Sequence, residues 1–113
     1  MRILRTSFYS IAVGAASVCC SGAWATGHHG KRVGYLQPAE ITTDCFYFTL
    51  EGVTQADPAK PNDPWFAVLR TQSGAKEMYA TLLAAKLSGS TLTQVNASGT
   101  IVCGYPQATM VML

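Results

Sequence analysis

Two adjacent histidines are the first side chains, after the N-terminal segment, that could take part in chemistry. His28 and His29 lie in the polar, glycine-flanked stretch 26–32. Imidazole is a common metal ligand, but neighbouring side chains of an extended segment point in opposite directions. No Cys, Asp or Glu lies close to them in the sequence. We therefore expect a flexible lead-in at residues 26–32 and no metal site.

A second set of candidates surrounds the loop at residues 52–64, which holds three of the five prolines. Asp57 and Asp63 suggest calcium ligands, but their spacing lacks the alternating pattern of an EF-hand loop. Long loops are often functional, so we take Asp57, Asp63 and Trp65 as candidate binding residues. The Trp65 ring either stacks on a sugar or peptide, or packs the loop onto the rest of the fold.

Residues 1–25 have the pattern of a secretory signal peptide. Two arginines precede an apolar run, and the segment ends in small residues around Trp24. This pattern predicts cleavage between Ala25 and Thr26, and hence an exported, periplasmic or secreted protein. An uncleaved membrane anchor is an alternative, although the apolar run is shorter than the roughly 20 residues that span a bilayer.

Lipidation is a further alternative for the leader, because Cys19 and Cys20 end the apolar run. A lipidated cysteine normally follows a small residue, whereas Val18 precedes Cys19. We therefore favour simple cleavage over lipid attachment.

Removal of the leader leaves two cysteines, Cys45 and Cys103. An even number of cysteines in an exported chain predicts a disulfide. Closing so long a loop stabilises the fold by on the order of 4 kcal/mol in the chain-entropy description. A metal site at these cysteines would need a second pair of ligands, which the sequence does not offer at suitable spacing. No cofactor is expected.

The charge of the processed chain excludes some classes of partner. Without the two leader arginines, six Lys and Arg face six Asp and Glu, with both histidines neutral. A chain with no net charge and no basic cluster lacks the phosphate-neutralising surface of a nucleic-acid-binding protein. It also lacks attraction to anionic lipid, so we expect no stable membrane insertion. The expected partners are an unknown protein or a glycan.

One helix is predicted, at residues 73–89. Ser73 suits its N-cap, and Gly89 suits the left-handed residue that ends a helix. Apolar side chains recur at three- and four-residue spacing, which predicts a buried face. That face comprises Ala75, Met78, Tyr79, Leu82, Leu83 and Leu87.

The rest of the chain reads as short strands separated by turns. The strongest strand is 41–51, in which Phe46, Phe48 and Leu50 alternate with residues of the other face. We expect a turn at 96–99 and a proline that breaks or bulges the ladder at Pro106. The other expected strands are 33–37, 65–70, 91–95, 100–105 and 107–113.

This order of strands, one helix and a closing hairpin is typical of OB barrels. We therefore predict a mainly β fold with one α-helix, a small five- to six-stranded OB-like barrel formed by residues 33–113. Around residues 41–105 the chain resembles the binding subunits of AB5-type bacterial toxins, especially the subtilase-cytotoxin and typhoid-toxin branch. It also resembles short exported bacterial proteins. The resemblance rests on Cys45-Phe46-Tyr47-Phe48, Trp65, and the segment Leu82-Leu83-Ala84-Ala85-Lys86-Leu87-Ser88-Gly89 followed by a strand.

The resemblance implies a fold, and with it ring assembly, more than a specificity. This chain has one cysteine pair, and no sugar-contacting residue of those subunits can be assigned a position in it. The sequence also lacks the motifs of hydrolases, metalloproteases and paired-acid enzymes. We therefore predict a non-catalytic binding or assembly module that recognises a glycan or a protein.

Two alternatives to a binding or assembly module stay open. The first is a structural or inhibitory envelope protein that acts on another protein. The second, which is less favoured, is a small secreted enzyme. The C-terminal segment Met110-Val111-Met112-Leu113 is apolar on both faces of a presumed strand. Such a strand is covered either by a second subunit, giving a homo-oligomer, or by the inside of a monomeric barrel.

Overall fold

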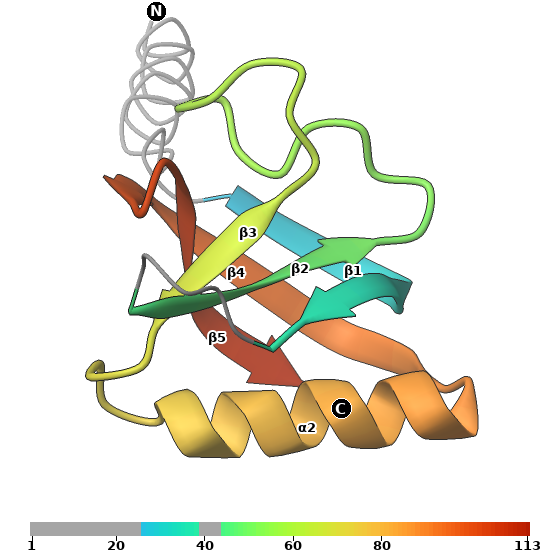
Figure 1. The fold of residues 1–113 in the computed structure, drawn as a ribbon. Helices are drawn as coiled ribbons and strands as arrows, with labels where there is room; N and C mark the ends of the chain where they lie inside the picture. Colours follow the sequence, from blue (N-terminus) through green and yellow to red (C-terminus); the bar gives the residue numbers. More distant parts are fainter. Residues whose placement is uncertain (1–25, 39–43) are drawn as a thin grey trace, which may run out of the picture.

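The computed structural model describes residues 26–38 and 44–113 of the chain. In this part five strands form a closed barrel in the order β1-β2-β3-β5-β4, and helix α2 lies across one end of it (Figure 1). The predicted OB-like barrel, mainly β with one helix, is confirmed. The leader, its cleavage site at Ala25, and residues 41–43 of the predicted second strand lie outside the described residues. The elements are β1 (Thr26–Gln37), β2 (Cys45–Leu50), β3 (Phe66–Leu69), α2 (Ala75–Ser88), β4 (Thr91–Val102) and β5 (Tyr105–Met112).

Strand β1 begins at Thr26, so the expected flexible lead-in at residues 26–32 is wrong. This half of β1 pairs with β4, with Thr26 opposite Ala97 and Arg32 opposite Thr91. The other half pairs with β2. The sequence pattern missed the first half because its pairing uses backbone groups, while most of its polar side chains face outward. The His28 side chain is an exception, because its ring packs edge-on against the core residue Phe66, with ring centroids 5.6 Å apart.

Strand β2 carries the centre of the core. Phe46, Phe48 and Leu50 are buried in the main apolar cluster, as their alternation predicts. Cys45 and Tyr47 lie in a second buried cluster on the opposite face. Because both faces are covered, all of β2 is buried.

Helix α2 covers one end of the barrel with a narrower face than the sequence predicts. Ala75, Leu82 and Ala85 are buried, whereas Leu83 and Leu87 are 37% and 79% exposed. The prediction that these two leucines belong to the buried face is wrong, because the barrel covers the side of the helix that carries Ala75, Leu82 and Ala85. Met78 and Tyr79 are partly buried against the core.

The helix begins and ends at glycines. Gly74 is the N-cap and makes no side-chain cap bond, so the predicted Ser73 cap is wrong. At the other end, Gly89 has the predicted left-handed conformation with φ 70°, and its N–H donates to the Ala85 carbonyl.

The closing hairpin turns later than the sequence predicts. Residues 96–99 do not form a turn; they lie in β4, where the register shifts on either side of Ala97. The chain reverses at Cys103 and Gly104, whose φ values are 50° and 84°. Two successive positive φ angles are what a two-residue type I′ hairpin requires. The predicted Cys45–Cys103 disulfide joins this turn to β2.

Candidate functional site

The candidate site is a surface cavity of about 460 Å³, which we call the aromatic cleft. It lies where β1, β2 and the loop before β3 meet. Its lining residues are Gly34, Tyr35, Thr49, Leu50, Glu51, Gly52, Val53, Pro64 and Trp65. The lining therefore combines two aromatic rings with several polar groups.

A bulge in β1 shapes this cleft. The register between β1 and β2 shifts between Val33 and Leu36, where β1 carries an extra residue. A Cβ atom at Gly34 would lie 2.6 Å from Thr49 Oγ1, so no side chain fits there without movement. The bulge leaves Tyr35 on the outside of the barrel, with 71% of its surface exposed.

The two aromatic side chains of the cleft stack on each other. The ring centroids of Tyr35 and Trp65 are 6.2 Å apart, and the ring planes differ by 21°. The Trp65 backbone N–H donates to Asp63 Oδ1 at 3.0 Å, and Asp63 Oδ2 lies 3.4 Å from Lys60 Nζ. Asp63 thus fixes the backbone that carries Trp65. Trp65 is half-buried and packs against the buried cluster of Cys45, Tyr47 and Ala67. The two rings form a preorganised apolar wall, and its Tyr35 side is open to solvent.

Two polar side chains stand beside this wall. Thr49 Oγ1 accepts a hydrogen bond from the Tyr35 N–H at 2.8 Å. Glu51 is exposed, and its backbone N–H donates to the Arg32 carbonyl at 2.8 Å. In the described part of the chain, its carboxylate has no hydrogen-bond or ion-pair partner. The cleft therefore offers a carboxylate that can accept hydrogen bonds, on a backbone fixed by β1, next to the two stacked rings.

Comparisons with known proteins add to this geometry. No protein-family model matches the chain, and no curated protein sequence matches it. Among solved structures, a chain of the GM1-bound form of the ECX AB5 holotoxin matches with a TM-score of 0.57 and 13% sequence identity. The match covers 88% of this chain and 92% of that chain.

The two chains share a fold. At 13% identity the likeness concerns the barrel and not its binding properties. It agrees with the sequence resemblance to AB5 toxin binding subunits.

The barrel does not bring all the predicted binding residues together. Trp65 lines the aromatic cleft, and Asp63 lies behind it as a backbone anchor. Asp57 does not line the cleft: it is only 2% exposed, and its Oδ1 accepts a hydrogen bond from the Thr26 hydroxyl.

The two histidines do not form a metal site with other side chains. His28 Nε2 lies 2.8 Å from the Ala56 carbonyl, to which it donates as the Nε2–H tautomer. Within residues 26–38 and 44–113, no three His, Cys, Asp or Glu side chains lie close enough to hold a metal ion.

Sequence reasoning missed Tyr35, Thr49 and Glu51 as parts of the site. Tyr35 sits in a stretch that reads as an ordinary short strand, and its outward position depends on the bulge. The only signal for the bulge is Gly34, since an isolated glycine within a strand pattern often marks one.

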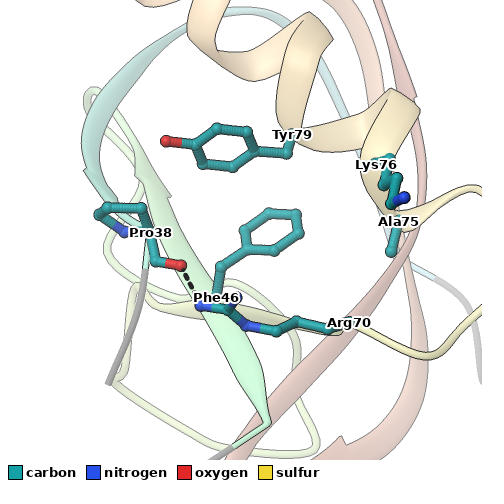
Figure 2. A pocket seen from close by; sticks show the side chains of 6 residues that line it. All are labelled: Pro38, Phe46, Arg70, Ala75, Lys76 and Tyr79. Carbon is teal, nitrogen blue, oxygen red and sulfur yellow. Dashed lines mark hydrogen bonds between the residues drawn. The ribbon is translucent and has the colours of Figure 1, made fainter. Parts of the chain in front are cut away.

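A second cavity of about 460 Å³ lies near the start of α2 (Figure 2). Tyr79 lies edge-on to Phe46, with ring centroids 5.3 Å apart. The Arg70 guanidinium donates to the Pro38 carbonyl at 2.5 Å. The lining residues are Pro38, Phe46, Arg70, Ala75, Lys76 and Tyr79. Because Phe46 is buried in the core and Tyr79 packs against it, we take the aromatic cleft as the candidate site.

The lining of the aromatic cleft combines apolar and polar groups. It contains no histidine or thiol, and the two cysteines of the described residues are joined in the disulfide. Its polar side chains are the Tyr35 and Thr49 hydroxyls and the Glu51 carboxylate, and Thr49 is buried.

In the stretches that the structure describes, no helix is long and apolar enough to cross a membrane.

Proposed function

We propose that this chain is an exported, non-catalytic binding module that recognises a glycan in the aromatic cleft. The observation that carries the proposal is the exposed stack of Tyr35 on Trp65 beside the free carboxylate of Glu51. The comparison with an AB5 holotoxin chain supports a binding role for the same barrel at a coarse level.

Sugar recognition needs both kinds of group present in the cleft. One face of a pyranose ring is lined with C–H groups, which pack on the flat, electron-rich face of an aromatic ring. Its edge carries hydroxyls, which donate to an ionised carboxylate in strong charge-assisted hydrogen bonds. Here the Tyr35–Trp65 wall supplies the first contact and Glu51 the second. Because the rings already stack on each other, little side-chain entropy is lost on binding.

Export is the second part of the proposal. It rests on the signal-peptide pattern of residues 1–25 with cleavage between Ala25 and Thr26, and on the disulfide between Cys45 and Cys103. Disulfides persist in oxidising compartments such as the periplasm or the extracellular space. The aromatic cleft would then meet glycans outside the cytoplasm.

Glycan-array binding of the mature protein tests the recognition proposal. Wild-type protein is expected to bind a subset of glycans, and both Trp65→Ala and Glu51→Gln are expected to weaken that binding at least about tenfold. Leu87→Ala is the matched control, because Leu87 is 79% exposed on the far side of α2. Binding that survives both cleft substitutions, or no glycan binding at all, would contradict the proposal.

Assembly is a second candidate function, favoured by exposed apolar side chains away from the cleft. Leu83 and Leu87 on α2 are exposed, as are Met112 and Leu113 at the end of β5. Such a distribution is typical of a surface that another copy or another envelope protein covers. Sedimentation of the mature protein is expected to show an oligomer that Leu83→Lys and Met112→Lys dissociate. A monomer at tens of micromolar protein would contradict assembly while leaving glycan recognition untouched.

A further inference from the structure

The carboxylate of Asp57 is the least explained polar group of the barrel. Asp57 lies in the loop between β2 and β3 and is 2% exposed. Its Oδ1 accepts a hydrogen bond from the Thr26 hydroxyl. Its Oδ2 is buried and has no hydrogen-bond partner among the described residues. A buried carboxylate oxygen without a donor is costly, so a missing partner is the expected explanation.

The neighbouring polar groups of the loop and of β1 are directed elsewhere. His28 Nε2 lies at the Ala56 carbonyl, 2.8 Å away. Lys60 Nζ lies 3.4 Å from Asp63 Oδ2 and donates to the Gly104 carbonyl at 2.8 Å. The Lys60 backbone N–H donates to the carbonyl oxygen of Asp57 and not to its side chain. None of these groups reaches Asp57 Oδ2.

One donor close to Asp57 changes its chemistry when the leader is removed. Thr26 is the first residue of β1 and the first residue after the predicted cleavage site. In the precursor its nitrogen is an uncharged amide with a single N–H. After cleavage the same nitrogen is an α-ammonium group, protonated at neutral pH, with three N–H donors.

Thr26 is already held at the carboxylate. Its hydroxyl contacts Asp57 Oδ1, and its nitrogen is separated from that hydroxyl oxygen only by Cα and Cβ. Its backbone is also positioned by β4, where it lies opposite Ala97. The nitrogen of Thr26 is therefore held near the same carboxylate.

We propose that Asp57 is the docking site for the α-ammonium group of Thr26 in the processed chain. Removal of the leader creates the positive charge that Asp57 Oδ2 lacks, and the ion pair locks the start of β1 to the loop before β3. The precursor, with an amide at Thr26, cannot form it. The inference rests on the proposed export, since it requires the leader to be removed after Ala25.

A double-mutant cycle tests this pairing. The four proteins are the chain that begins at Thr26, the same chain with Gly-Ser added before Thr26, and both again with Asp57→Asn. In the Asp57 background, the added residues are expected to raise the unfolding equilibrium constant at least about tenfold, because a charged hydrogen bond is lost. In the Asp57→Asn background, the same addition is expected to change it less than about twofold. Urea denaturation with the disulfide intact measures all four.

Asp63→Asn is the matched control, because Asp63 is a partly exposed carboxylate of the same loop that pairs with Lys60. With Asp63→Asn, the added residues are expected to destabilise the chain as much as in the wild type. An equal effect of the addition in the Asp57 and Asp57→Asn backgrounds would overturn the docking site. If Asp57→Asn does not fold, a structure of the chain that begins at Thr26 decides: a Thr26 nitrogen beyond hydrogen-bond distance of both Asp57 oxygens overturns it.

N-terminal sequencing of the exported protein tests the processing step separately. A first residue of Thr26 supports the inference, and any other first residue overturns it. Neither result changes the glycan-array outcome, so failure of this inference and failure of the proposed recognition can be told apart.

Discussion

The barrel has two stacked aromatic pairs that differ in their exposure to solvent. Phe48 and Phe66 stack inside, with centroids 4.8 Å apart, planes 8° apart and no exposed surface on either ring. Tyr35 and Trp65 stack outside, at 6.2 Å and 21°, with Tyr35 largely exposed. The inner pair is packed like a core, and the outer pair leaves ring surface open to solvent.

The difference arises between two consecutive residues. Phe66 is the first residue of β3, and Trp65 directly precedes it. Successive side chains of an extended chain point to opposite faces. One ring therefore goes to the core and its neighbour to the cleft. Burial supplies stability for the first pair, whereas the second pair retains contact area for another molecule.

Truncation of the inner pair is expected to have the largest effect. Phe66→Ala should lower the free energy of unfolding by about 3–5 kcal/mol, because it removes buried area and leaves a cavity against Phe48. Urea denaturation measures this loss, and Phe66→Leu should cost clearly less. A loss below 1 kcal/mol would mean that the inner stack is not the core of the barrel.

Filling the bulge is expected to have the next largest effect. Gly34→Ala places a Cβ atom 2.6 Å from Thr49 Oγ1, and that hydroxyl is held by the Tyr35 N–H. The free energy of unfolding should fall by about 1–3 kcal/mol, the usual cost of overpacking. Thr49→Ala in the same chain should restore part of the loss. Destabilisation that is simply additive in the double variant would argue against this clash.

Truncation of the fixed member of the outer pair is expected to cost less. Trp65→Ala should lower the free energy of unfolding by about 1–2 kcal/mol, because it removes the stack on Tyr35, worth about 0.5–1.5 kcal/mol, and the packing of Trp65 on the buried cluster of Cys45, Tyr47 and Ala67. The same variant should lose glycan binding, so the substitution should reduce affinity far more than it reduces stability. A loss as large as that of Phe66→Ala would make Trp65 a core residue and not a recognition residue.

Truncation of the exposed member is expected to have the smallest effect on folding. Tyr35→Ala should lower the free energy of unfolding by about 0.5–1 kcal/mol, because it removes the stack on Trp65 and little other packing. Titration calorimetry with a glycan identified on the array should still show weakened binding. Unchanged affinity would restrict the recognition surface to Trp65 and Glu51.

Much of the fold could be predicted from the sequence where side chains carry the information. The alternation of β2 and the left-handed Gly89 were both visible, because core packing and glycine geometry constrain residue type. The first half of β1 was not visible, because backbone pairing with β4 tolerates the polar residues of 26–32. The position of the hairpin was also missed, since Asn96-Ala97-Ser98-Gly99 has turn composition but lies in an irregular strand.

The candidate site was predicted only in part. Trp65 was found by its residue type and its place after a long loop. Tyr35 was not found, because a one-residue bulge decides which face of β1 it occupies. Asp57 was predicted as a candidate binding residue because it lies in a long loop, yet it is only 2% exposed. Burial of a single loop residue depends on tertiary packing that local sequence does not encode.

The pairing of β1 with β4 also has a consequence for the order of folding events. Strand β1, which places His28 opposite Val95, can complete its ladder with β4 only when nearly the whole chain is present. Contacts between residues so far apart in sequence make folding slow, because a large loop must close before they form. A barrel of this topology therefore cannot close while the chain is still being synthesised up to β4.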